Sequence, residues 1–86
     1  MFGLTSQLKR SGVSIPSNIA EGHRRGSDKE FMQFLNIARG SLAEVETQII
    51  IATDIKLIDD SVSAEMLTEI NEVGKMINGL MSALAK

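Results

Sequence analysis

The sequence predicts an all-α fold, an antiparallel up-down helical bundle of three helices. Apolar residues recur at helical spacing along nearly the whole 86-residue chain, which contains a single Pro. Two short polar segments interrupt this pattern, at residues 22–26 and 59–61, and both are too short to link separate domains. We therefore expect one domain over residues 1–86, with helices at about 4–21, 28–56 and 62–85.

The first expected helix, at about residues 4–21, contains Pro16. A Pro inside a helix removes one hydrogen bond, and its ring crowds the carbonyl group four residues back. That carbonyl belongs to Gly12, whose missing side chain lets the backbone bend. We predict one kinked helix, the alternative being a loop at residues 13–17. Its apolar residues are Leu4, Leu8, Val13, Ile15, Ile19 and Ala20.

The second expected helix begins at a capping box, Ser27-Asp28-Lys29-Glu30. In such a box the Ser hydroxyl accepts from the backbone N–H near the Glu, and the Glu side chain reaches back. Beyond it, apolar residues alternate at spacings of four and three, which places them on one face of the helix. This stripe comprises Phe31, Leu35, Ala38, Leu42, Val45, Ile49 and Ala52.

The second helix is also apolar outside this stripe, at Met32, Phe34, Ile37, Ile50 and Ile51. A helix that is hydrophobic over most of its circumference needs more than one neighbouring surface to bury it. Two partner helices within this chain are too few for that. The run Ile49–Ile51 could also form a short strand, but the helical register continues through it, so we predict a helix.

The third expected helix carries a stripe at Met66, Ile70, Val73, Ile77, Leu80 and Leu84. These residues are again spaced by four and three, as in a helix that packs one face into a bundle. The opposite face is polar, with Thr68, Asn71, Glu72, Lys75, Asn78 and Ser82. We expect the stripe to lie in the core.

Composition excludes several classes of protein. With no Cys, the chain forms neither disulfides nor thiolate metal sites. The longest apolar run, Ile49–Ala52, is far below the roughly 20 residues that span a bilayer, so we expect no membrane contact. The first residues lack the continuous hydrophobic segment of a secretory signal. We expect a cytoplasmic protein.

Charge is distributed unevenly. Residues 1–43 contain six basic and three acidic residues, whereas residues 44–86 contain three basic and eight acidic ones. The segment between the first two helices places Arg24 and Arg25 beside the free backbone amides that open the second helix, a geometry suited to phosphate or carboxylate. The alternative is a charged turn whose arginines are solvated or paired with acids. Lys9 and Arg10 extend this basic region if they face the same way.

Other polar residues give no catalytic or metal site. The only His, His23, cannot form a multi-imidazole centre and is expected to be solvated or to face an anion. Glu21 and Glu44 could form an acid-base pair, but nothing fixes their separation. We predict instead a buried or half-buried polar network that sets the helix register, formed by Asn18, Glu21, Glu44 and Gln48. We expect no cofactor, no metal ion and no enzyme activity.

Three segments carry a resemblance to a known family: LTSQLKR at 4–10, VSIPSNIAEG at 13–22 and EFMQFLNIARGSLAEVETQ at 30–48. Together they resemble the 23S rRNA intervening-sequence protein family, and GKMINGL at 74–80 resembles it more loosely. The resemblance implies antiparallel four-helix bundles that assemble as ring-shaped homopentamers without enzymatic activity. It also implies relatives that bind nucleic acid and accompany the reverse transcriptase of diversity-generating retroelements.

The resemblance starts at the second helix of that family, so we expect this chain to be one helix short of the four-helix bundle. It also lacks the strongly basic character of the relatives that bind nucleic acid. Two hypotheses follow. The chain is a homo-oligomeric scaffold that contacts RNA or DNA phosphates through Lys9, Arg10, His23, Arg24 and Arg25, or it is a protein-directed adaptor whose bundle is completed by a partner helix.

Overall fold

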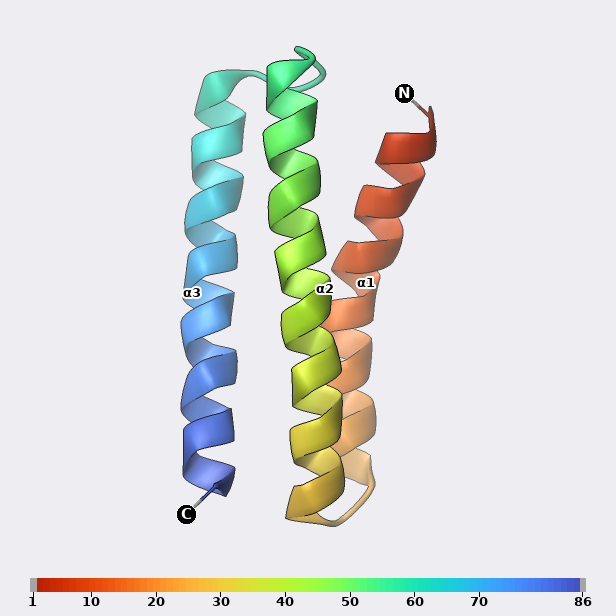
Figure 1. The fold of residues 1–86 in the computed structure, drawn as a ribbon, viewed down its shortest axis with the longest axis vertical. Coiled ribbons are helices and arrows are strands. Elements are labelled where there is room, and N and C mark those ends of the chain that lie inside the picture. Colours follow the sequence, from red (N-terminus) through yellow and green to blue (C-terminus); the bar gives the residue numbers. More distant parts are fainter. Residues whose placement is uncertain (1, 86) are drawn as a thin grey trace.

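The chain forms three antiparallel helices, as the computed structural model shows for residues 2–85 (Figure 1). Helix α1 spans Phe2–Arg24, α2 spans Asp28–Asp54 and α3 spans Asp60–Leu84. The all-α prediction is confirmed, and the described residues contain no strand. The run Ile49–Ile51 lies within α2, so the strand alternative is wrong.

Helix α2 lies between the other two and contains most of the core. In the described part of the chain, the backbones of α1 and α3 both approach α2 closely but do not approach each other. The predicted stripe of α2 is confirmed: six of its seven residues are buried, Leu35, Ala38, Leu42, Val45, Ile49 and Ala52. Because a fully buried Leu or Ile side chain contributes about 1.5–3 kcal/mol, this stripe provides much of the stability of the fold.

Helix α1 continues without interruption through Pro16, so the loop alternative at residues 13–17 is wrong. Its N-terminal half leans away from α2, as predicted for a bent helix (Figure 1). The residues of α1 that are buried are Ser11 and Gly22, whereas Leu8, Ile15 and Ile19 are only half-buried. The apolar face of α1 is therefore turned partly away from α2.

Helix α3 departs from the prediction in the same way. Of its predicted stripe Ile77 is buried, Ile70, Val73 and Leu84 pack half-buried against the core, and Leu80 is 41% exposed. Met81, which the stripe did not include, also packs against the core. The backbone of α3 packs closely on α2 alone. The edge of the apolar face of α3 that no other helix covers, which includes Leu80, therefore stays exposed.

The helix ends are set by two local motifs. Lys56 has φ 67°, and the N–H groups of Lys56 and Leu57 bond to the carbonyls of Thr53 and Ala52, the pattern of a Schellman C-cap. Helix α2 therefore ends at Asp54 rather than at the expected residue 56. Asp59 caps α3, and the hydrogen bonds from the Val62 N–H and the Ser61 hydroxyl hold the pKa of its carboxyl below the ordinary value.

Lys56 occupies a backbone conformation that favours glycine, because an L-residue there brings its Cβ close to a carbonyl oxygen. We expect Lys56→Gly to raise the free energy of unfolding by about 0.5–1 kcal/mol, the gain being limited by the greater freedom of Gly in the unfolded chain. Urea denaturation measures it. Lys56→Ala removes the same charge but keeps the strain, and an equal gain in that variant would contradict the explanation.

Gly22 marks the closest approach of α1 to α2. A Cβ atom at this position would lie 2.7 Å from Phe34 Cβ and 3.0 Å from Phe31 Cδ1. The first of these atoms is fixed to the backbone of α2 and cannot move aside by rotating. The absence of a side chain at Gly22 therefore allows the two helices to meet near the turn that joins them.

Gly22→Ala should force α1 and α2 apart and lower the free energy of unfolding by about 1–3 kcal/mol, the usual cost of overpacking. The matched control is Gly40→Ala, because a Cβ at Gly40 meets nothing within 4 Å. Replacing that Gly in the interior of α2 should stabilise the protein by about 0.5–1 kcal/mol. Urea denaturation of both variants at one protein concentration makes the comparison, and a similar effect of the two substitutions would argue against the close contact.

Candidate functional site

The turn between α1 and α2 is the strongest candidate site from the sequence, and its backbone is well defined. Gly26 has φ 81°, which reverses the chain after α1. Ser27 then caps α2, because its Oγ accepts from the Glu30 N–H at 3.2 Å. The Ser27 hydroxyl also donates to Glu30 Oε1 at 3.3 Å. The Ser27 half of the predicted capping box is thus confirmed, and the Glu30 carboxylate reaches back to the hydroxyl of Ser27 in place of its backbone N–H.

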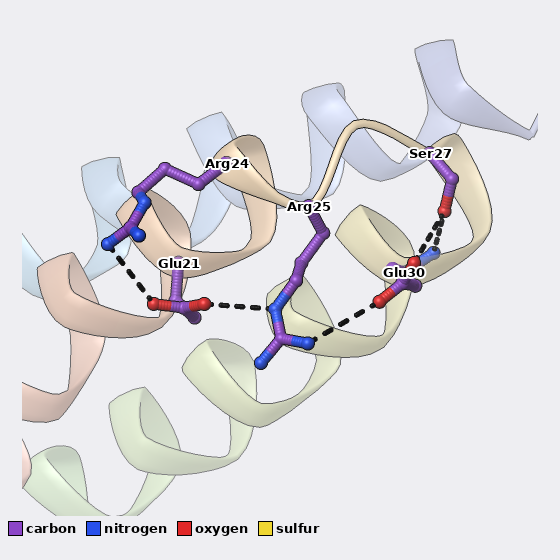
Figure 2. Close-up of polar contacts among 5 residues, drawn as sticks. All are labelled: Glu21, Arg24, Arg25, Ser27 and Glu30. Atoms are coloured by element: carbon purple, nitrogen blue, oxygen red, sulfur yellow. Dashed lines mark hydrogen bonds and ion pairs between the residues drawn. The ribbon is translucent and has the colours of Figure 1, made fainter.

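Arg25 is held between two carboxylates, as Figure 2 shows. Its Nε donates to Glu21 Oε2 at 2.9 Å, and its Nη1 lies 3.7 Å from Glu30 Oε2. The guanidinium also lies over the Phe34 ring, with Cζ 5.1 Å from the ring centroid, a cation–π contact. Arg25 therefore connects the end of α1 to the start of α2 and is largely committed to structural contacts.

Arg24 remains more available. Its side chain is 77% exposed, and its only ion pair among the described residues is a loose one, 3.7 Å from Nη1 to Glu21 Oε1 (Figure 2). His23 packs edge-on against Phe31, with ring centroids 5.8 Å apart. The start of α2 already has the carboxylates of Asp28 and Glu30 in its first turn, where they complement the helix dipole. Of the turn residues, Arg24 is thus the best placed to meet an outside anion.

The structure does not gather the five predicted basic residues in one place. Lys9 and Arg10 lie in the N-terminal half of α1, and fourteen residues of helix separate Arg10 from Arg24, a rise of about 21 Å. Fourteen residues is close to four helical turns, so Arg10 and Arg24 lie on the same side of α1. His23, Arg24 and Arg25 are adjacent at the turn. The predicted set forms two groups along α1.

The four residues of the predicted polar network also separate. Glu21 belongs to the turn, where it pairs with Arg24 and Arg25. Asn18 donates to the carbonyl and the hydroxyl of Ser14, one turn back in its own helix, at 2.8 and 2.9 Å. Glu44 accepts from the Ser11 hydroxyl at 3.4 Å, and Gln48 Oε1 is buried without a hydrogen-bond partner in the described part of the chain.

Polar contacts between α1 and α2 do exist, but serines make them. Ser14 Oγ lies 2.9 Å from Ser41 Oγ, and Ser11 is one of the few buried residues of α1. The sequence prediction missed both α1 serines and Ser41. Their spacing is a usable signal, because Ser11, Ser14 and Asn18 repeat the three-then-four spacing of Ser41, Glu44 and Gln48. Two matching polar stripes at that spacing indicate two helices that face each other through polar residues.

An apolar groove of about 400 Å³ runs between α1 and α3, with the buried stripe of α2 at its base. Its walls are the half-buried apolar residues of the outer helices, including Leu8 and Ile15 of α1 and Met66, Ile70 and Val73 of α3. Val62, Met76 and Leu80 are further exposed apolar residues of α3. The described residues that line this groove are mainly apolar, and Glu69 of α3 is the one charged residue among them.

No three His, Asp or Glu side chains among residues 2–85 come close enough together to hold a metal ion. Within the same part of the chain, no helix is long and apolar enough to cross a membrane. The arrangement offers an apolar groove, a turn whose most exposed arginine is Arg24, and a polar contact between α1 and α2.

The sequence is similar to one established family. The family model described as 23S rRNA-intervening sequence protein matches residues 1–79, which includes all of α1 and α2 and most of α3. No curated protein matches the sequence. The helical structure and the segments at 4–10, 13–22 and 30–48 agree with this match.

Proposed function

The chain belongs to the family of 23S rRNA-intervening sequence proteins, and on that premise we propose that it is a non-enzymatic scaffold that self-associates. The observation that carries the proposal is the apolar groove between α1 and α3. Three helices leave this groove open along the buried stripe of α2. A second copy of the chain would cover it and bury the half-buried apolar residues of α1 and α3 that line it.

The outer helices provide the apolar surface for such an assembly. Apolar residues that border the groove, such as Ile15 of α1 and Val73 of α3, stay half-buried. Met76 of α3, outside the groove, is 61% exposed. Each large apolar side chain that becomes fully buried gains about 1.5–3 kcal/mol. Burial of several of them at once exceeds the roughly 1 kcal/mol or less of an exposed ion pair, so apolar contact would dominate the association.

Charge complementarity favours contact between unlike edges of two copies. Helix α1 carries three basic residues and one acidic residue, whereas α3 carries four acidic residues and one basic residue. The α1 edge of one copy and the α3 edge of the next would therefore attract each other. Such head-to-tail contacts close into rings when the rotation between copies permits, and the homopentamer implied by the family resemblance is an assembly of this kind.

We expect light scattering to give a mass above that of one chain, and we expect the double variant Met76→Lys/Leu80→Lys to shift it toward the monomer. Both side chains are exposed on α3, so the change should leave the single-chain fold intact while placing charge in the contact. Circular dichroism checks that the helices persist.

The matched control is Asn71→Lys/Ser82→Lys, which adds the same charge to the exposed polar face of α3. It should leave the assembly unchanged. A wild-type protein that is monomeric at every concentration would overturn self-association and favour the second candidate, an adaptor whose groove accepts a helix from a different protein.

Contact with nucleic acid is a second part of the proposal, and Arg24 supports it. Its guanidinium is exposed at the turn and on the same side of α1 as Arg10. In a ring, every copy would present such an arginine, so contacts that are weak singly would add up. The chain has a net charge of −2, so we expect local contact with phosphates without sequence preference.

Arg24→Ala should weaken the binding of a short single-stranded RNA and lower the slope of log affinity against log salt by about 0.7 for each phosphate that the variant no longer neutralises. Fluorescence anisotropy at several salt concentrations measures the slope. Lys75→Ala, which removes an exposed positive charge from α3, is the control and should change little. Equal slopes for the wild type and Arg24→Ala would remove Arg24 from the proposed interface.

A further inference from the structure

A polar pocket of about 450 Å³ lies between α1 and α2, on the other side of their contact from the apolar groove. Its walls include Gln7, Arg10 and Ser11 of α1 together with Ser41, Glu44 and Gln48 of α2. The pocket lies toward the N-terminal half of α1, the part that leans away from α2 (Figure 1). Its volume falls within the range of small-molecule sites, about 300–1,000 Å³.

The hydrogen-bonding capacity of this pocket is incompletely used. Gln48 Oε1 is buried and accepts no hydrogen bond from the described residues, and a buried acceptor without a donor is unfavourable. Ser11 is 8% exposed, and its hydroxyl reaches Glu44 Oε2 only at 3.4 Å, a long distance for a hydroxyl donor. The Glu44 carboxylate is exposed to a ligand in the pocket, whereas Gln48 Oε1 has almost no accessible surface and is not within its reach.

The two charged residues of the pocket come from different helices. Arg10 belongs to α1 and Glu44 to α2, and neither takes part in an ion pair within the part of the chain that the structure describes. A purely anionic ligand would meet the Glu44 carboxylate, and a purely cationic ligand would meet the Arg10 guanidinium. A ligand that carries both charges avoids both conflicts.

We propose that this pocket binds a small zwitterion, a free α-amino acid. Its carboxylate pairs with the Arg10 guanidinium, which suits bidentate contact with a carboxylate. Its ammonium group donates to the Glu44 carboxylate. No aromatic or aliphatic side chain lines the pocket, so it lacks the stacking surface that a nucleobase requires. This site is independent of the proposed self-association and of Arg24.

The test is an NMR titration of the ¹⁵N-labelled full chain with L-serine as the probe. We expect saturable shifts of the backbone amides of Ser11, Ser41 and Gln48, with smaller effects on α3, which contributes no residue to the pocket. Arg10→Gln and Glu44→Gln should each weaken the binding at least tenfold. Glu46→Gln and Lys75→Gln remove exposed charges elsewhere and should leave the affinity unchanged.

Acetate and methylammonium, each carrying one of the two charges, serve as separate probes. Binding of either one as tightly as L-serine would overturn the assignment of a zwitterion. The proposal also fails if L-serine gives no saturable shifts, or if both pocket variants bind it like the wild type. Shifts of the pocket amides that follow protein concentration instead of L-serine would identify a second copy as the occupant and overturn the small-molecule site.

Discussion

The burial of α2 is the constraint on which the rest of the structure depends. Its six buried residues form one continuous stripe, and α1 and α3 cover that stripe from two sides without their backbones meeting. Because an α-helix has a full circumference to cover, two neighbours leave part of its surroundings open. One open part is the apolar groove, and Ile37, Ile50 and Ile51 are exposed on another part of α2. The drive to self-associate that we propose is thus a consequence of how this chain distributes its apolar residues.

Both outer helices pack apolar residues against the core, Ile15 and Ile19 from α1 and Ile77 and Met81 from α3. Helix α1 also places Ser11 and Ser14 opposite Glu44 and Ser41. Polar contacts of this kind contribute little net stability, about 0.5–1.5 kcal/mol per hydrogen bond, but they are satisfied in one register only. Close approach at Gly22 fixes one end of the α1–α2 contact. The polar side of α1 therefore sets how α1 is aligned along α2. The apolar side of α1 forms one wall of the groove.

At the turn between α1 and α2, contacts that hold the fold together reduce the number of arginines available to an outside ligand. The arginines and the capping residues are adjacent in sequence, and the same carboxylates that cap and charge the start of α2 also attract guanidinium groups. Arg25 is consequently bound by Glu21 and Glu30 and covers Phe34. Arg24 points outward because Glu21 is already engaged by Arg25 at the shorter distance, 2.9 Å against 3.7 Å. Proximity in sequence thus produced one structural arginine and one exposed arginine.

The sequence predicted the features that depend on interactions between residues close together in the chain, and it missed those that depend on contacts between helices. The α2 stripe and the Ser27 cap depend on contacts within one helix or one turn, so spacing and residue type predicted both. The outcome at Leu80 depends on which neighbour α3 packs against, and helical spacing carries no such information. The same holds for Glu21 and Glu44, which share a chemical type but lie at the turn and beside Ser11 respectively. The way two helices pair decides which polar groups meet. In this sequence the pairing of α1 with α2 is indicated by one pattern, the same three-then-four spacing in two sets of polar residues: Ser11, Ser14 and Asn18, and Ser41, Glu44 and Gln48.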